Sequence, residues 1–429
     1  MKETSQSPGR EAGAARDLSK LPRNVWAVTL TSFLTDISSE MLFNLLPIFL
    51  FSVLGVRTAF IGLIEGLADA AASLLKMVSG WLSDRLGARK PLAVLGYAVS
   101  TVAKPFLYLA ASWPGVLAIR FADRVGKGLR TAPRDALVAD SVDEESRGIA
   151  FGLHRAGDTA GAVVGIAAAM VILASSGGAT GELSRRAFQG VVVASVIPAA
   201  LAVLILSLGA REVRRTRILE AAQAPGSQAA ESEARLGREF RRYLLLMVIF
   251  TLGNSSDAFL ILRARVAGLS VLGVLGMMLS FNLVYALVSI PAGVLSDRVG
   301  RKRLLVGGWL FYALVYMGFW RAQAGWQAWV LMLLYGVYYG LTEGVARAYV
   351  ADLVPAEKRG TAYGGLHTAV GLTALPASLI AGVLWQGLGG WGGFGQGAPF
   401  LFGSLMALLA AAGLASLVPG RGLPAREGA

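Results

Sequence analysis

The sequence predicts an all-α polytopic membrane protein in which 12 transmembrane helices form two related six-helix bundles. Three observations lead to this fold class. The 429 residues are 55% hydrophobic and only 16% charged, which is unusual for a soluble protein of this length. Apolar runs of spanning length recur along the chain, and parts of the first half reappear in the second.

The apolar runs divide the chain into five regions. A transmembrane helix needs about 20 mostly apolar residues, and runs such as residues 191–210 meet that requirement. We expect a cytosolic tail, an N-terminal six-helix bundle, a cytosolic linker, a C-terminal six-helix bundle and a second cytosolic tail. Their predicted ranges are 1–23, 24–210, 211–242, 243–418 and 419–429. The linker is too charged to span a membrane.

The charge distribution predicts the orientation. The formal net charge is +13, and most basic residues fall in short segments that alternate with the apolar runs. Under the positive-inside rule, both termini are expected to be cytoplasmic, in a multi-pass protein of the inner or plasma membrane. The basic residues form no stripe with interleaved aromatics, so nucleic acid is not an expected partner. The polar first 20 residues are not expected to be a signal peptide.

The chain repeats itself in polar as well as apolar positions. GWLSDRLGARKPL at residues 80–92 matches GVLSDRVGRKRLL at residues 293–305 in seven of thirteen positions. A Ser-Ser pair followed by an acid occurs near the start of each half, at residues 38–40 and 255–257. Shared hydrophobicity alone would not align such residues. Parallel repeats around a central site are typical of transporters.

The two copies of G-x-L-S-D-R-x-G resemble motif A of the major facilitator superfamily, and RVGKG at residues 124–128 more loosely resembles its motif B. The resemblance spans nearly the whole chain and implies the 12-helix fold of that family. It also implies a charge network that holds the cytoplasmic gate shut; the alternative is an ordinary basic loop. The corresponding residues are Gly80, Asp84, Arg85, Gly87 and Arg89 in the first copy, and Gly293, Asp297, Arg298, Gly300 and Lys302 in the second.

The fourth predicted helix carries a stripe of cations. Arg120, Arg124, Lys127, Arg130 and Arg134 are spaced by three or four residues and therefore share one helical face. The apolar run before Arg120 is too short to span alone, so the stripe enters membrane depth, where charges face the bundle interior. Asp123 is placed to pair with Lys127 at i+4, and the cations could pair with Asp36 or Glu40. Whether the stripe serves a transport cavity or a structural gate stays open.

The resemblance implies that the first, fourth, seventh and tenth helices line a central cavity, and these are the polar helices of the chain. The candidate pathway residues are Asp36, Ser39, Glu40, Arg120, Asp123, Arg124, Lys127, Asn254, Ser256, Asp257, Glu343 and Arg347. Because a carboxylate can be neutral when buried and charged when exposed, Asp36, Glu40 and Asp257 are the expected proton carriers.

These features favour a secondary active transporter that exports a small solute in exchange for protons. Three alternatives stay open: symport or uniport of an anionic metabolite, the same for a metal ion, or a membrane receptor on the same fold. The sequence has no P-loop and no catalytic motif in a convincing context, so it is not expected to be an enzyme. Cysteine is absent, and no cofactor or metal site is expected. The expected partners are a small-molecule substrate, protons and the bilayer, and we expect a monomer.

Overall fold

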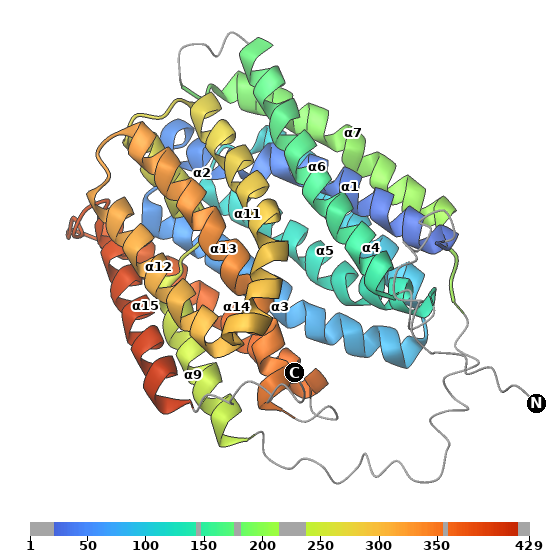
Figure 1. Ribbon diagram of the computed structural model, residues 1–429. Helices are drawn as coiled ribbons and strands as arrows, with labels where there is room; N and C mark the ends of the chain where they lie inside the picture. Colours follow the sequence, from blue (N-terminus) through green and yellow to red (C-terminus); the bar gives the residue numbers. More distant parts are fainter. Residues whose placement is uncertain (1–20, 143–146, 176–181, 214–236, 355–358, 419–429) are drawn as a thin grey trace, which may run out of the picture.

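The computed structural model of the chain describes residues 21–142, 147–175, 182–213, 237–354 and 359–418, and within them it contains helices but no strands. Figure 1 shows two bundles side by side, one from the first half of the chain and one from the second. We call them the N half and the C half.

The N half contains six membrane-crossing segments. In order they are α1 (Arg23–Phe43) continued by α2 (Leu46–Ile48) and the π-helix η2 (Phe49–Val53), α3 (Thr58–Leu86), α4 (Arg89–Ala103) continued by the 3-10 helix η3 (Lys104–Leu109), α5 (Trp113–Asp140), α6 (Arg147–Ser175) and α7 (Arg185–Gly209).

The C half repeats this order. Its segments are α9 (Arg238–Gly253) continued by α10 (Ala258–Val266), α11 (Val271–Val299), α12 (Arg301–Arg321), α13 (Gly325–Leu353), α14 (Arg359–Gln386) and α15 (Ala398–Leu417). Helix α9 begins at Arg238, so the basic end of the predicted linker forms its first turn.

Two of these twelve segments are less apolar than the others. Within the described residues, ten segments are long and apolar enough to cross a membrane by themselves, and α5 and α13 are not among them. Helix α5 carries the cationic stripe, and α13 carries tyrosines where the other helices carry aliphatic residues. The two helices occupy the same place in their halves. Each must therefore rely on its neighbours to shield polar groups from lipid.

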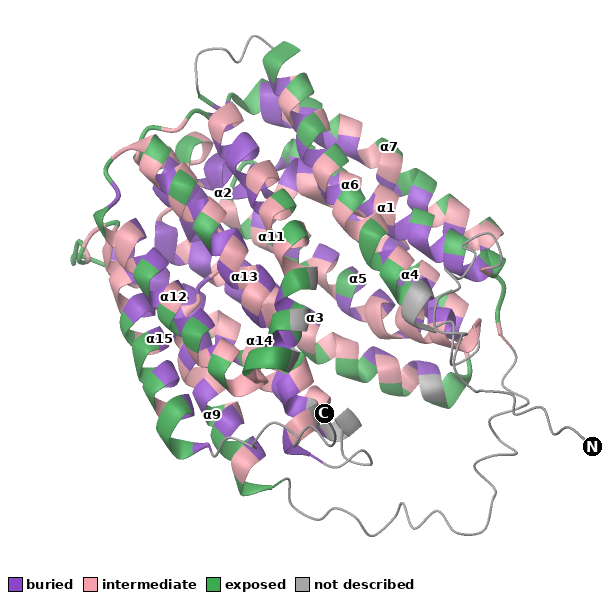
Figure 2. Ribbon diagram, in the orientation of Figure 1, coloured by how far each residue is buried: buried purple, intermediate pink, exposed green. Residues whose placement is uncertain are grey.

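The outer surface of the bundle is apolar. Figure 2 shows exposed residues along the outward faces of the helices. Among them are large side chains such as Val171, Ile197, Leu208, Leu287 and Leu314, each more than half exposed. A soluble protein would bury such residues, whereas lipid chains solvate them at no cost.

The first and seventh segments are interrupted near their middles. Helix α1 ends at Phe43, and a turn at Asn44 and Leu45 leads into α2, where Pro47 lacks an N–H donor. In the C half the backbone leaves the helix at Asn254 and starts again at Ala258. Broken helices free backbone groups in the membrane interior, and transporters commonly place binding sites there.

The two halves touch most closely at one end of the bundle. We call the end where α1 begins and α15 stops the linker end, and the opposite end the far end. Near the far end, α3 packs against α14 so closely that a Cβ atom on Gly66 would lie 2.8 Å from the Cα atom of Leu375. Thr58 also donates from its backbone N–H to Gln386 Oε1 at 2.9 Å. Glycine contacts and hydrogen bonds therefore seal the far end.

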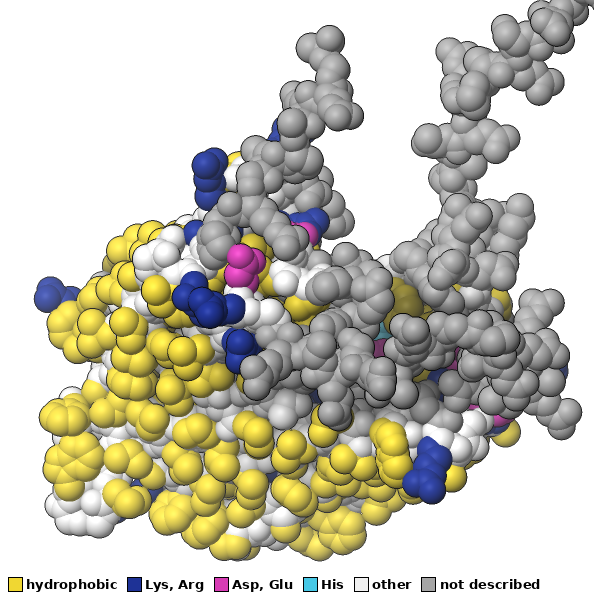
Figure 3. All heavy atoms as spheres, turned by 90° about the horizontal axis from the view of Figure 1, so that it is seen from below, with side chains coloured by type: hydrophobic (Ala, Val, Ile, Leu, Met, Phe, Trp, Pro, Cys, Tyr) yellow, Lys and Arg dark blue, Asp and Glu magenta, His cyan; other side chains and the backbone are white. Residues whose placement is uncertain are grey.

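The linker end is different. Three glycines near this end, Gly152, Gly344 and Gly364, meet no neighbouring atom within 4 Å of the position of a Cβ. Lysine and arginine side chains lie on this end, next to the broad apolar surface of the bundle, as Figure 3 shows. The halves thus close at the far end and leave space between them toward the linker end.

Candidate functional site

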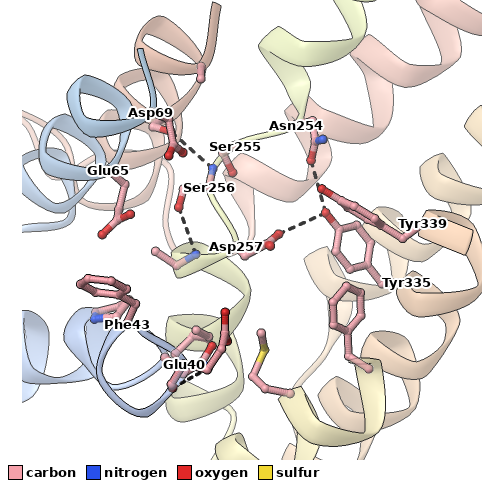
Figure 4. A pocket seen from close by; sticks show the side chains of 18 of the residues that line it. Glu40, Phe43, Glu65, Asp69, Asn254, Ser255, Ser256, Asp257, Tyr335 and Tyr339 are labelled. Atoms are coloured by element: carbon pink, nitrogen blue, oxygen red, sulfur yellow. Dashed lines mark hydrogen bonds between the residues drawn. The ribbon is translucent and has the colours of Figure 1, made fainter. Parts of the chain in front are cut away.

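A central cavity of about 430 Å³ lies between the two halves. Six of the predicted pathway residues line it: Glu40, Arg120, Arg124, Asn254, Ser256 and Asp257. Figure 4 shows that its acids and aromatics come from both halves, with Glu65 and Asp69 of α3 on one side and Tyr335 and Tyr339 of α13 on the other. The volume is in the range of sites for small organic molecules.

Two ion pairs between α3 and α5 form the wall of the N half. Arg120 Nη2 donates to Glu65 Oε2 at 2.8 Å, and one turn further along both helices Arg124 Nε lies 3.6 Å from Asp69 Oδ1. Asp123 Oδ2 lies 3.8 Å from Arg120 Nη1. The expectation that Asp123 pairs with Lys127 is therefore wrong. Arg120 and Arg124 form ion pairs with α3, while Arg124 also acts on Glu40 through its charge. The reason is that α3 runs alongside α5 and presents two carboxylates at the matching spacing.

Phe43 lies among the cations of this wall. Its ring centroid is 3.9 Å from the guanidinium carbon of Arg120 and 5.6 Å from that of Arg124, and Lys104 Nζ is 5.8 Å away. An aromatic face attracts cations through its quadrupole. The sequence analysis did not select Phe43, because an aromatic residue at the end of an apolar run carries no distinctive signal.

Lys104 binds the two serines of the first Ser-Ser-acid motif. Its side chain is 1% exposed, and Nζ donates to Ser38 Oγ at 2.8 Å and to Ser39 Oγ at 3.0 Å. Ser39 was predicted in the pathway, but it binds this lysine and is not among the residues that line the central cavity. The sequence analysis missed Lys104 because it is a single charge within an otherwise apolar run.

The wall of the C half is built from amides and tyrosines. Three hydroxyl groups converge on Asn254 Oδ1, those of Tyr312, Tyr316 and Tyr335, at 3.3 to 3.5 Å. Tyr335 also donates to Asp257 Oδ1 at 3.2 Å, as Figure 4 shows. Asn254 and Asp257 lie in the non-helical segment between α9 and α10, which lets both side chains reach the same tyrosine.

Two acids from equivalent places in the halves face this cavity. Glu40 Oε2 accepts from Asn44 Nδ2 at 2.9 Å, and Asp257 accepts from Tyr335. Neither carboxylate makes an ion pair with any described lysine or arginine, in contrast to Glu65 and Asp69. Among the described residues, no group of three or more histidine, aspartate or glutamate side chains is arranged to hold a metal ion.

The remaining cations of α5 belong to a polar network of the N half. Arg130 Nη1 donates to Ser100 Oγ at 2.6 Å, and Arg134 Nη1 donates to Ser32 Oγ at 3.1 Å. Asp36 interacts electrostatically with these two arginines and with Lys127. Neither Asp36 nor Lys127 lines the central cavity. The cationic stripe is thus divided: its far-end part faces the cavity and its linker-end part binds α1 and α4.

Two smaller cavities continue from the centre toward the linker end. The nearer one has a volume of about 210 Å³ and shares Asn254 and Tyr339 with the central cavity. The other has a volume of about 300 Å³ and shares Glu343 and Arg347 with the 210 Å³ cavity. Glu343 and Arg347 pair at 2.6 Å. These two predicted residues therefore lie on the route between the centre and the linker end.

A polar link joins the halves along this route. Arg155 Nη2 of α6 donates to the Tyr285 hydroxyl of α11 at 3.0 Å, and that hydroxyl donates to Glu343 of α13. Arg155 also lies 3.8 Å from Glu343. The link is partly exposed, because the Arg155 side chain is 59% exposed and that of Glu343 is 26% exposed.

The motif A loops turn at glycines with positive φ, +61° at Gly87 and +95° at Gly300. Each loop is tied to its own half: Arg89 pairs with Asp140 at 3.3 Å and Arg301 pairs with Asp352 at 2.5 Å. The structural equivalent of Arg89 is thus Arg301 and not Lys302, which binds the carbonyl groups of Ala415 and Val418.

The other motif A residues are more varied. Gly80 approaches Ala132 of α5, whereas Gly293 meets no atom within 4 Å. The Arg85 guanidinium lies over the Trp81 ring, and Arg298 is exposed. The side chains of Asp84 and Asp297 lie outside the described part of the structure, so the predicted latch stays a prediction.

The chain is similar in sequence to a transporter and to a multidrug resistance protein. The chain is 34% identical over 401 residues to an uncharacterised transporter of the Major Facilitator type from Methanocaldococcus jannaschii, covering 91% of this chain and 94% of that one. A multidrug resistance protein from Proteus mirabilis is 37% identical over 110 residues, which is 25% of this chain and 27% of the relative.

Solved structures show the same fold. The crystal structure of a D-xylose-proton symporter superimposes with a TM-score of 0.72 at 18% identity, covering 93% of this chain and 98% of that chain. The family model of the Major Facilitator Superfamily matches residues 28–281 and 261–428. The predicted fold of 12 spans in two halves is confirmed. The chain belongs to the Major Facilitator Superfamily and is a multi-pass membrane transporter.

Proposed function

We propose that the chain exports a small organic solute in exchange for protons. The observation that carries the proposal is the pair Glu40 and Asp257, which come from the repeated Ser-Ser-acid motifs and line one cavity without an ion pair to any described lysine or arginine. An acid without a fixed counter-ion is available to bind either a proton or a group of the substrate.

Exchange follows from competition at these acids. A carboxylate enclosed by protein favours its neutral form, and one that is open to water favours its charged form. If a proton and the substrate use the same carboxylate, each promotes release of the other, and the two move in opposite directions. The space between the halves toward the linker end lets both reach the cavity from that side.

The direction of transport and the orientation have separate support. The relative from Proteus mirabilis is named a multidrug resistance protein, which favours export. The basic loops at residues 85–90 and 298–303 lie at the linker end, which favours a cytoplasmic location for that end and for both termini. In this orientation the cavity opens to the cytoplasm of a cell, in the inner or plasma membrane, and the transporter acts as a monomer.

A second candidate is symport of an organic anion with protons. It is favoured by Arg120 and Arg124, which line the same cavity and have buried nitrogen atoms without a hydrogen-bond partner among the described residues. In this scheme protonation of Glu40 and Asp257 would assist anion binding, so that both move in the same direction.

Everted membrane vesicles with an acidified lumen distinguish the two candidates. A pH-sensitive dye reports the lumen while ethidium, benzoate or 4-(aminomethyl)benzoate is added outside. Antiport releases protons from the lumen and symport brings protons in, so the dye signal changes in opposite directions. We expect proton release with at least one compound, and loss of that release in a Glu40→Gln, Asp257→Asn double variant.

The matched control is Glu182→Gln, which neutralises an exposed acid at the far end. It should behave as the unmodified chain does. Proton release that is equal in the double variant would remove both acids as carriers, and proton uptake would favour the symport scheme.

A further inference from the structure

Two groups of opposite charge share the central cavity. Arg120 and Arg124 extend from α5, while Glu40 and Asp257 extend from α1 and from the start of α10. A transporter for a simple cation has no use for the arginines, and one for a simple anion has no use for unpaired acids. The question is which ligand would satisfy both groups.

The arginines have hydrogen-bonding capacity that the protein does not use. Arg120 is 3% exposed, and its Nε and Nη1 atoms are buried without a hydrogen-bond acceptor among the described residues. The Nε atom of Arg124 is in the same situation. Leaving such a donor unsatisfied costs about 1–3 kcal/mol. A ligand carboxylate offers two acceptor oxygens in the geometry that guanidinium groups bind best.

The two acids, Glu40 and Asp257, can accept further hydrogen bonds from a ligand. Within the described part of the chain, the side chain of each acid accepts a single neutral hydrogen bond, Glu40 from Asn44 and Asp257 from Tyr335. The side chains whose charges act on Asp257 include the carboxylates of Asp69, Glu40 and Glu65. A protonated amine of a ligand would supply the positive charge that this side of the cavity lacks.

An apolar, aromatic surface also lines the cavity. Phe281 and Tyr335 stack with ring centroids 5.7 Å apart, and Tyr339 packs edge-on against both. All three rings line the cavity, and Phe43 lines its other side. Such rings provide contact area for a cyclic or aromatic body and an additional attraction for an ammonium group.

We propose that the substrate is a zwitterionic organic molecule, with a carboxylate that binds Arg120 and Arg124, an ammonium group that binds Asp257 and Glu40, and a ring that packs against the aromatic side chains of the cavity. The proposal rests on the proposed function, since the ammonium group is what competes with the proton. It adds the requirement for a second, anionic group on the same molecule.

Matched ligands test this requirement by equilibrium binding to the purified, detergent-solubilised chain, without any proton gradient. The zwitterions are phenylalanine, tryptophan and 4-(aminomethyl)benzoate. Each is compared with an analogue that lacks the carboxylate (phenethylamine, tryptamine, benzylamine) and one that lacks the amine (3-phenylpropionate, indole-3-propionate, 4-methylbenzoate). At least one zwitterion should bind about tenfold or more tightly than both of its analogues.

Two variants should separate the charges. Arg124→Gln should weaken binding of the zwitterion and the anion by about tenfold and leave the cation unchanged, whereas Asp257→Asn should weaken the zwitterion and the cation only. Arg186→Gln and Glu182→Gln make the same chemical changes at exposed far-end positions and should alter none of these affinities. Arg124→Lys should restore part of the binding, and thermal melting verifies that each variant is folded.

Several results would overturn the proposal. Cations that bind as tightly as zwitterions, with no effect of Arg124→Gln, would show a cation site. Anions that do so, with no effect of Asp257→Asn, would show an anion site. Failure of all three zwitterions to bind would also reject it. A zwitterion that binds selectively but releases no protons from vesicles would refute antiport while leaving the substrate class intact.

Discussion

The two halves share one scaffold but fill its centre differently. Helices α5 and α13 occupy equivalent places, and the shared ion pairs at Asp140 and Asp352 fix their register at 212 residues. In that register Asp123 corresponds to Tyr335 and Lys127 to Tyr339. At these two positions the N half has a charge and the C half has a phenol.

The difference shows how each half satisfies its buried polar groups. A buried charge needs an opposite charge nearby, and the N half supplies it with pairs such as Arg120–Glu65. A phenol needs only a hydrogen-bond acceptor, and the C half supplies Asn254 and Asp257. Fold symmetry therefore constrains the helix positions but not the chemistry placed on them.

The largest loss of stability is expected when an ion pair of the N half is broken. Glu65→Gln removes the charge that faces Arg120, which leaves a buried guanidinium without its closest counter-ion. We expect a loss of about 3–5 kcal/mol in the free energy of unfolding, measured by chemical unfolding in mixed micelles. Glu182→Gln is the exposed control. A loss below about 1 kcal/mol, the size of a surface pair, would mean that Asp123 alone compensates Arg120.

A smaller effect is expected from Lys104→Met. The substitution keeps the apolar stem but removes the ammonium group that binds Ser38 and Ser39, so both hydroxyls lose a buried partner. We expect a loss of about 1–3 kcal/mol in the same unfolding assay. Lys90→Met, at a partly exposed position, is the control. An unchanged stability would indicate that the two hydroxyl oxygens accept from other donors, and that the Ser-Ser motif does not depend on this lysine.

The corresponding change in the C half should cost less. Tyr335→Phe removes the hydroxyl that binds Asp257 and Asn254 but preserves the ring and its stacking on Phe281. Because the substitution removes a neutral hydrogen-bond donor and no counter-ion, we expect a loss of about 1 kcal/mol. A loss as large as that of Glu65→Gln would mean that the tyrosine network is as critical as the ion pairs, and the contrast between the halves would fail.

The smallest effects are expected where the halves are alike. Arg301→Ala breaks a partly exposed pair with Asp352, and a loss of about 0.2–1 kcal/mol is typical for such pairs. Arg89→Ala should cost more, because the Arg89 side chain is 10% exposed and that of Arg301 is 30% exposed. The reverse order, in the same assay, would show that the loops are not equivalent.

Much of the fold was predictable because the relevant signals are local. Apolar runs identify the spans, and the spacing of Arg120, Arg124 and Lys127 places these cations on one helical face. The partners of those cations were not predictable in the same way. An i+4 spacing suggested Asp123 with Lys127, but a buried guanidinium binds whichever carboxylate the neighbouring helix presents, and that depends on how α3 and α5 pack.

Other parts of the site depend on positions that look ordinary in the sequence. Lys104 and Phe43 each occur once in an apolar stretch, and only the fold brings them together beside Arg120. The repeat alignment matched Arg89 with Lys302, since identical residues align best at an offset of 213. The structure shifts that register by one residue, because the C-half loop uses Arg301 at the start of α12.

The position of Phe43 has a spectroscopic consequence. A ring in contact with two guanidinium groups and near a third cation lies in a strong local electric field, and it directly precedes the break that ends α1. A nitrile attached to this ring has a stretching frequency that shifts with the field along its bond. The infrared spectrum of such a labelled chain would report the neutralisation of nearby charges or a movement of the end of α1, without any need to know the transported molecule.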